Sequence, residues 1–296
     1  MRVHRSSATA VVATLAVLGF ARFPQTANAG MVTAAYYHLG EADPGAAAGV
    51  TGKNPTIDSS GNGLDLTALL SSTYSSNVAA TAAANTGSTL SMQIGGPVYD
   101  PDTDTYTLAG YGSGTFNWTT NTMNFCLEGW FKTSYPATQQ ALAFNGNSYM
   151  DGYGLYLING TVQGIYGGIG NFDTTFVPTA NEWFYAALVN VGGTTSVYVN
   201  STTPMVVDAT LTPNTTESTM AMIGMAGYWS SPQDPLLGSA DEVRMSTFNG
   251  VTQVFDANTD LLIAVPEPSH MVFVAGIGAV LGAWQMRRGK RGKRKR

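Results

Sequence analysis

The sequence predicts an all-β fold, an antiparallel two-sheet jelly-roll sandwich, and three observations favour it. Short strand-like runs recur along the middle of the chain, separated by Gly, Asn, Asp and Pro. Only 11% of the residues are charged and 34 are glycine, a composition typical of β-rich extracellular proteins. Helical periodicity is scarce, and the longest alanine-rich stretch, residues 77–85, predicts one helical turn or a loop.

The predicted strands are short and are joined by tight turns, which is typical of sandwiches and jelly rolls. Asn159-Gly160 predicts a hairpin turn because both residues tolerate positive φ, and Gly192-Gly193 predicts a second turn. Trp130, Trp183 and Tyr198 are the expected core anchors. The predicted strands are Leu64–Thr67, Thr89–Ile94, Thr105–Ala109, Asn124–Lys132, Gln140–Phe144, Gly154–Ile158, Thr161–Tyr166, Trp183–Val191, Ser196–Val199, Met205–Val207, Ala221–Gly224 and Ala240–Met245.

Residues 1–29 predict a cleavable N-terminal signal peptide. A basic start is followed by an apolar run over Ala8–Phe20. Small residues at Ala27 and Ala29 then place the cleavage before Gly30. The alternative is an uncleaved anchor or a first helix.

Residues 265–296 have three parts: Pro266-Glu267-Pro268, the uncharged stretch Met271–Met286 and the basic block Arg287–Arg296. The uncharged stretch predicts one short transmembrane helix, roughly 24 Å long against a hydrocarbon core of about 30 Å. The basic block holds the chain end in the cytoplasm. This order resembles the PEP-CTERM sorting signal. The resemblance implies cleavage by an exosortase after secretion, transient passage through the inner membrane, and release to the cell surface or the exopolysaccharide matrix. A plain C-terminal anchor is the alternative.

Residues 30–264 form the predicted ectodomain, without internal repeats. This region contains three basic residues, Lys53, Lys132 and Arg244, and 18 of the 19 acids, so its net charge is −15. An acidic surface repels phosphate backbones, so we expect no nucleic-acid partner. The single cysteine, Cys126, excludes an internal disulfide and a multi-thiolate zinc site.

Several ectodomain segments resemble the laminin-G-like, concanavalin A-like lectin jelly-roll family in the family's order. Residues 36–41 with 58–63 are similar to its opening strand and turn, and residues 125–132 to its "F-T-I-E-A-W-V-K" strand. Residues 182–189 and 197–200 are similar to its paired "W-x-H-V-A" and "L-Y-V-N-G" strands, and residues 238–245 to its closing strand. The resemblance implies a two-sheet sandwich that often binds glycans or proteins, frequently near a Ca²⁺ ion at its rim.

The catalytic pattern known on this fold is incomplete here, so we expect no enzyme activity and no catalytic residue. Glu41-Ala42-Asp43 begins the E-x-D-x-x-E pattern of endo-β-glucanases, but Ala46 replaces the second glutamate. Asp241 and Glu242 are adjacent, and on a regular strand their side chains point to opposite faces. His38 is the only histidine of the ectodomain, and a structural role is expected for it.

Calcium is the expected cofactor, because it takes oxygen ligands from acidic loops. Asp58 and Asn62 form one candidate site, and Asp100, Asp102 and Asp104 a second; the alternative for each is a solvated acidic turn. Asp241 is a third candidate, or else it closes a salt bridge with Arg244. Tyr228 and Trp229, in a Gly/Ser/Pro-containing loop, are the candidate sugar-stacking residues.

The sequence thus predicts an exported protein of the cell envelope, cell surface or extracellular matrix that reaches its place through a membrane-anchored intermediate. Its ectodomain is expected to be a non-catalytic module that binds carbohydrate or a surface polymer such as exopolysaccharide. One alternative is a secreted glycan-active hydrolase or lyase on the same fold, and another is a structural envelope protein without a specific ligand.

Overall fold

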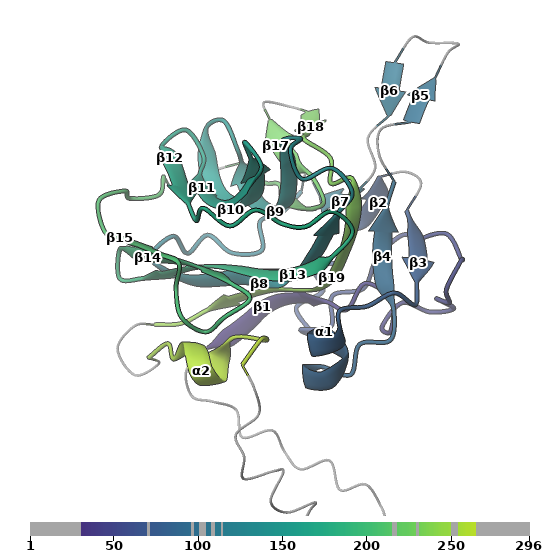
Figure 1. The fold of residues 1–296 in the computed structure, drawn as a ribbon, viewed down its shortest axis with the longest axis horizontal. Helices are drawn as coiled ribbons and strands as arrows, with labels where there is room; N and C mark the ends of the chain where they lie inside the picture. The colour runs from purple at the N-terminus through teal and green to yellow at the C-terminus, as the bar shows by residue number, and fades with distance from the viewer. Residues whose placement is uncertain are drawn as a thin grey trace, which may run out of the picture.

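The computed structural model describes residues 31–69, 72–95, 98–100, 105–107, 110–113, 115–214, 218–228, 231–249 and 254–264. Two antiparallel sheets lie face to face (Figure 1). The first, called here the β8 sheet, has the strand order β15 (Val206–Asp208), β14 (Thr194–Val199), β13 (Trp183–Val191), β8 (Asn124–Thr133), β19 (Gly238–Thr247), β4 (Ser91–Ile94) and β3 (Thr73–Ser75). β1 (Val32–Tyr37) also pairs with β19.

The second sheet, called the β10 sheet, has the order β12 (Gly170–Asp173), β11 (Thr161–Tyr166), β10 (Asp151–Ile158), β9 (Gln140–Asn147), β16 (Ala221–Ile223), β7 (Gly110–Ser113) and β2 (Thr67–Leu69). A hairpin of β17 (Ala226–Tyr228) and β18 (Ser231–Gln233) adjoins β9. Another hairpin, β5 (Val98–Asp100) with β6 (Thr105–Thr107), projects from the sandwich (Figure 1). The all-β two-sheet prediction is confirmed.

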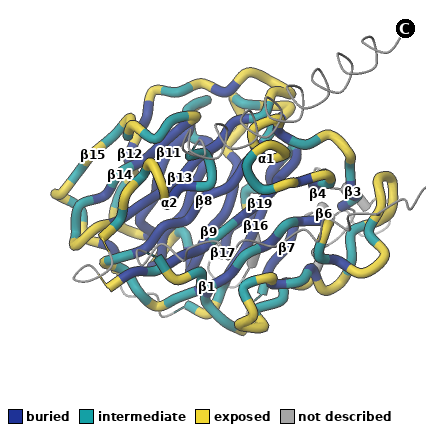
Figure 2. Tube along the Cα trace, turned by 90° about the horizontal axis from the view of Figure 1, so that it is seen from below, coloured by how far each residue is buried: buried dark blue, intermediate teal, exposed yellow. Residues whose placement is uncertain are grey.

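The core between the sheets follows from period-two alternation along the strands. Phe125 and Leu127 of β8 and Leu155 of β10 point inward and are completely buried. The ring of Phe125 stacks on that of Tyr153 from the opposite sheet, with centroids 3.7 Å apart. The buried strands form the interior of the chain trace in Figure 2, and the exposed residues lie mainly in the loops. This apolar contact between the sheets accounts for stability without a disulfide.

Each predicted strand overlaps an observed one, and both predicted turns are confirmed. Asn159 and Gly160 have φ of 52° and 84°, and Gly192 and Gly193 have 57° and 95°. Residues 77–85 contain one short helix, α1 (Ala80–Asn85). Of the expected anchors, Trp130 and Tyr198 are buried, whereas Trp183 is only partly buried and lies under the Lys132 ammonium group.

The outer face of the β8 sheet is covered. Residues 254–264, called the C-terminal strap, include α2 (Ala257–Asp260) and pack with α1 on a second apolar cluster around Trp130 and Tyr185. Figure 2 views the molecule from the side on which both helices lie. Met31, at the other end of the described chain, packs against the same cluster.

The predicted export signals lie outside the described residues. They comprise the cleavage residues Ala27, Ala29 and Gly30, the sorting motif Pro266, Glu267 and Pro268, and the apolar stretch 271–286. In the described part of the chain, neither helix has the length and apolar character needed to cross a bilayer. The signal peptide, the sorting tail and its transmembrane helix stay predictions.

Candidate functional site

A groove opens on the outer face of the β10 sheet, next to the β17–β18 hairpin. Its cavity volume is about 360 Å³. The lining combines aromatic, aliphatic and amide side chains with one carboxylate: Gln139, Ser148, Tyr149, Tyr156, Ile158, Ile165, Asn171, Gln233 and Asp234. Concave surfaces with apolar walls and a few converging polar groups are the usual places for small-ligand binding.

Strand alternation determines which side chains reach this groove. On β10, Leu155 and Leu157 point into the core, so Tyr156 and Ile158 point outward. On the neighbouring β11 the outward residue Ile165 extends the apolar floor. These outward residues form a third buried apolar cluster, separate from the core between the sheets.

The β17–β18 hairpin forms the other wall. Gly227 pairs with Asn147 at the end of β9, and the Ser148 hydroxyl donates to the Gly227 carbonyl at 2.8 Å. At the far end of the hairpin, the Ala141 amide donates to the Asp234 carbonyl at 2.7 Å. These contacts bring Gln233 and Asp234 beside the strand residues of the groove.

Polar groups converge on the Tyr156 hydroxyl. This oxygen is buried, and no described group meets hydrogen-bond geometry with it, although Ser148 and Asp234 lie close enough to affect its pKa. Burial, above all, raises the pKa of Tyr156, so the hydroxyl keeps its proton at neutral pH. Because this oxygen is buried, Tyr156 contributes its ring to the floor of the groove and does not present its hydroxyl to a ligand.

The amide groups beside this hydroxyl are already oriented. The Gln139 amide nitrogen donates to the Asp234 carboxylate at 3.0 Å, and that of Asn171 donates to Gln163 at 3.1 Å. Each of these side chains retains further donor or acceptor capacity. Tyr149, in the turn between β9 and β10, exposes half of its surface at the groove. An exposed ring beside fixed amides and a carboxylate suits a polyhydroxylated ligand.

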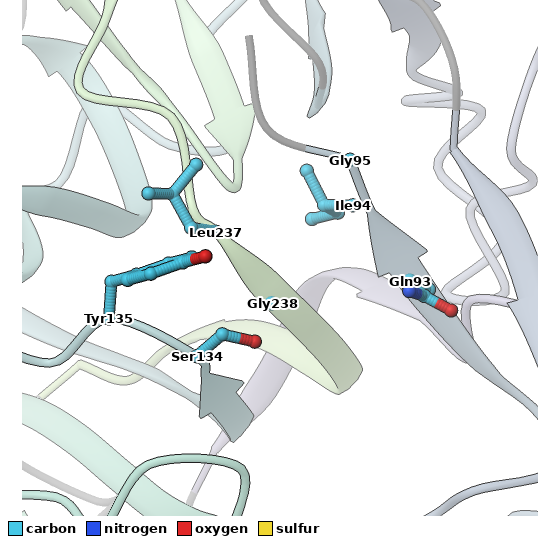
Figure 3. Close-up of a pocket in the computed structure, with 7 residues that line it drawn as sticks. All are labelled: Gln93, Ile94, Gly95, Ser134, Tyr135, Leu237 and Gly238. Carbon is cyan, nitrogen blue, oxygen red and sulfur yellow. The ribbon is translucent and has the colours of Figure 1, made fainter.

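A second cavity, of about 180 Å³, lies where β4 and β8 end and β19 begins (Figure 3). Tyr135, Leu237 and Ile94 line it, and its one aromatic ring, that of Tyr135, is 62% exposed. The Ser134 hydroxyl is already bonded to the Asn181 side chain at 2.9 Å. The groove has about twice this volume and more convergent polar groups, so it is the better candidate.

One of the two predicted sugar-stacking residues, Tyr228, belongs to the hairpin next to the groove. Tyr228 is the last residue of β17, in the hairpin that forms one wall of the groove. Its side chain and the whole of Trp229 lie outside the described part of the structure. Their role as stacking residues therefore stays a prediction; of the two, only the Tyr228 backbone is described, and it lies in the hairpin beside the groove.

Asp58 and Asn62 organise their own loop. The Asp58 carboxylate accepts four hydrogen bonds, from the Tyr36, Ser60 and Leu64 amides and the Ser60 hydroxyl, at 2.8–3.1 Å. The Asn62 amide nitrogen donates to the Ala34 carbonyl at 2.9 Å. These bonds pin the loop to β1 and occupy the Asp58 oxygens, so the pair fits poorly as a cation site.

Asp241 is buried next to Ser88, whose hydroxyl donates to it at 2.9 Å. Burial, together with Glu242 and Glu41, raises the pKa of Asp241 to about 9. A protonated carboxyl group is a poor calcium ligand. The alternative salt bridge with Arg244 is wrong: the Arg244 guanidinium pairs with Glu128, with its Nε 2.8 Å from the carboxylate.

The regular-strand argument for Asp241 and Glu242 also needs correction. A bulge interrupts β19 between Asp241 and Arg244, and Glu242 has a φ of 51°. Ala240 and Val243 therefore both face the core, although an odd number of positions separates them. Glu242 accepts hydrogen bonds from the Tyr36 hydroxyl and from His38, which gives His38 the expected structural role.

The remaining calcium candidates are Asp100, Asp102 and Asp104. Asp100 ends β5, and its side chain and the whole of the other two residues lie outside the described part. Among the described residues, no three His, Cys, Asp or Glu side chains gather as a metal site. The calcium hypothesis stays a prediction that depends on this acidic turn.

Sequence reasoning missed the groove residues themselves. A signal for the groove was nevertheless present in the sequence. The strand that contains Leu155, Tyr156, Leu157 and Ile158 is apolar on both faces. A strand on the outside of a sandwich normally alternates apolar and polar residues. Two apolar faces indicate that the outward face is covered or binds something.

Neither a protein-family model nor a curated protein matches the sequence. Solved structures do match the fold. Domain 4 of AbnA, an extracellular GH43 arabinanase from Geobacillus stearothermophilus, aligns with a TM-score of 0.51 and 14% identity over 74% of this chain and 94% of that domain. The binding domain of Paraclostridial Mosquitocidal Protein 1 aligns with a TM-score of 0.53 and 9% identity over 79% of this chain. The chain spans about half (52%) of that second structure. These similarities establish a shared β-sandwich fold.

Proposed function

We propose that this protein is an exported, non-catalytic carbohydrate-binding module that holds a glycan in the groove of the β10 sheet. The observation that carries the proposal is the lining of this groove, where the half-exposed Tyr149 ring lies with the side-chain amides of Gln139 and Asn171 and the Asp234 carboxylate. The half-exposed Tyr149 ring supplies an apolar surface for a sugar face at the same groove.

Two further observations support binding rather than hydrolysis. Glycosidases of the common types act with two carboxylates, roughly 5–10 Å apart, across the scissile bond. The described lining of the groove has a single carboxylate, Asp234, and that group already accepts the Gln139 amide. The similar arabinanase domain was solved in complex with arabinotriose, so a sandwich of this kind can hold a short glycan.

The export part of the proposal rests on the sequence of the two ends. The secretory pattern and the PEP-CTERM-like tail support delivery to the cell surface or matrix, with an exosortase as processing partner. Deletion of Met271–Arg296 should release the domain in soluble form, as measured by fractionation of cells. Membrane retention of the shortened chain would remove the anchor assignment.

The groove is tested with residues 30–264 by affinity electrophoresis in gels containing arabinan, galactan or a neutral β-glucan. We expect retention by at least one polymer. Loss of one aromatic–sugar contact corresponds to about 1 kcal/mol, so Tyr149→Ala should weaken retention roughly fivefold. Tyr156→Phe removes only a buried hydroxyl and should change retention by less than about twofold.

Tyr135→Ala is the matched control, because it removes an exposed tyrosine from the second cavity. If Tyr135→Ala weakens binding and Tyr149→Ala does not, the site is the second cavity. If the wild type binds none of the polymers, glycan binding is wrong. Repeating the gels with a calcium chelator separately tests the acidic turn at Asp100, Asp102 and Asp104.

A further inference from the structure

We infer that the groove selects uncharged glycans and rejects polymers that carry carboxylate or sulfate groups. This inference rests on the proposed function and specifies its ligand class. The observation behind it is the placement of charge, which is independent of the groove's shape. All three cations of the ectodomain lie away from the groove, whereas carboxylates lie in and beside it.

The three cations lie on other parts of the domain. Lys132 lies 4.9 Å from the Trp183 ring centroid and donates to the Asn77 side chain at 2.9 Å, on the outer face of the β8 sheet. Arg244 is paired with Glu128 beneath the C-terminal strap. Lys53 lies in the loop beside β3, where its backbone amide donates to the Tyr74 hydroxyl at 3.0 Å. The sequence has no other Lys or Arg between residues 30 and 264.

The groove itself is acidic. Asp234 lines it, and Asp173 is exposed on β12, where it pairs in register with the groove-side residue Gln163. A ligand carboxylate bound here would find amide and hydroxyl donors but no cation within reach. Charges of like sign separated by less than the Debye length, about 8 Å at physiological salt, repel each other appreciably. The net charge of −15 on the ectodomain adds a long-range repulsion of the same sign.

The donors and acceptors that remain are suited to neutral hydroxyl groups. Gln139, Asn171 and Gln233 each offer both an amide N–H and a carbonyl oxygen, and Asp234 offers acceptors only. A sugar hydroxyl can donate and accept at once, so it can satisfy such a mixed lining. An ionised acid group accepts only, and it would face the Asp234 carboxylate unpaired.

The test compares two derivatives of one polymer, the neutral polysaccharide that the wild-type domain retains most strongly among arabinan, galactan and β-glucan. One portion is carboxymethylated, and a second is hydroxyethylated to the same degree of substitution, which adds similar bulk without charge. At 20 mM salt we expect at least tenfold weaker retention by the carboxymethyl form. At 0.5 M salt the difference should fall to about twofold, because salt screens the repulsion.

Two variants locate the effect. Gln233→Lys puts a cation into the groove. At low salt it should narrow severalfold the difference in retention between the hydroxyethyl and carboxymethyl forms. Val254→Lys adds the same charge to an exposed position of the C-terminal strap and should leave the difference unchanged. If both variants narrow it equally, the whole surface and not the groove selects the ligand.

The outcomes separate the two proposals. Retention of the carboxymethyl form equal to or stronger than that of the hydroxyethyl form overturns the charge selection, while glycan binding stands. Failure of the wild type to be retained by any of the three starting polymers overturns the proposed function, and the charge selection with it.

Discussion

The two outer faces of the sandwich both bear large apolar side chains, but these side chains are covered to different extents. Each sheet points large apolar side chains away from the core: Trp130 and Tyr185 on the β8 sheet, and Phe144, Tyr156 and Ile165 on the β10 sheet. On the β8 sheet the C-terminal strap and α1 cover them. On the β10 sheet the β17–β18 hairpin covers only part of the face and leaves the groove. An apolar outward face therefore indicates either a structural cover or a ligand surface.

Charge distinguishes the two faces further. Beneath the strap, Glu128 is completely buried and bonded to Arg244, to the Tyr185 hydroxyl and to the Leu262 amide, the last at 2.8 Å. Arg244 also donates to the Asp260 carbonyl of the strap. These bonds join the strap to the sheet. In the groove, by contrast, the one carboxylate of the described lining, Asp234, accepts a hydrogen bond from the Gln139 amide and has no cation beside it. The covered face thus pairs its buried carboxylate with a cation, and the open face does not.

The largest predicted effect is a loss of stability that arises at the covered face alone. Arg244→Met leaves the Glu128 carboxylate buried without its cation, and loss of one partner of a buried pair typically costs about 3–5 kcal/mol. We expect urea unfolding of residues 30–264 to show a decrease of this size in the free energy of unfolding. Retention by the neutral polymer should be unchanged under conditions where the variant is folded, because the groove is on the opposite sheet.

A second substitution distinguishes charge from packing. Glu128→Gln added to Arg244→Met removes the unpaired charge but keeps an acceptor for the Tyr185 hydroxyl and the Leu262 amide, so it should restore at least half of the loss. Lys132→Met is the surface control and should cost under about 1 kcal/mol. If the double variant is no more stable than Arg244→Met, burial of charge is not the cause.

The next prediction is a dependence of stability on pH, which also arises in the β8 sheet. The pKa of Asp241 is raised to about 9, mainly by burial, whereas an unfolded aspartate titrates near pH 4. Between these values the folded state holds a proton that the unfolded state has released, so stability falls as pH rises. The expected slope is about 1.4 kcal/mol per pH unit, or about 3 kcal/mol between pH 6 and pH 8.

Asp241→Asn should flatten this slope and raise the melting temperature at pH 8, measured by calorimetry, because the amide cannot ionise. The pKa of His38 is also raised, chiefly by its hydrogen bond to Glu242. Its stabilisation is complete below the unfolded pKa of about 6.5 and is lost as pH rises through the higher folded value, so it acts in the same direction. The slope that remains in Asp241→Asn measures this contribution. An unchanged slope would show that Asp241 is already ionised in the folded protein.

Sequence reasoning predicted the fold well where local rules act alone. The long strands β8, β13 and β19 are continuous runs rich in apolar and β-forming residues, and nearly every residue in them is buried. Asn159-Gly160 takes positive φ, so both features can be recognised from consecutive residues. The strands that it missed, such as β3, β7 and β12, have only three or four residues. Such short runs cannot show an alternation.

The site was harder to predict because it joins distant segments. Tyr156, Asn171 and Asp234 meet only after the β17–β18 hairpin packs beside β9, which depends on tertiary contacts. The same holds for Glu128 and Arg244, which are 116 positions apart. The bulge in β19 also upset a period-two argument that is sound for regular strands. Local propensity thus predicts the elements, and the long-range contacts determine which carboxylates are buried, paired or free to meet a ligand.

The smallest predicted effect concerns tethering, and it follows from where the two ends leave the domain. Met31 and the strap residues Leu262 and Ile263 all pack on the outer face of the β8 sheet, opposite the groove. A domain immobilised through a tag after Ala264 should therefore bind the neutral polymer as well as it does in solution. Immobilisation through Ile169→Cys, in the exposed turn before the groove residue Asn171, should reduce binding severalfold. Cys126 is completely buried and burial raises its thiol pKa well above the usual value, so labelling will be confined to the new cysteine. Equal binding in both orientations, measured by biolayer interferometry, would place the ligand elsewhere on the surface.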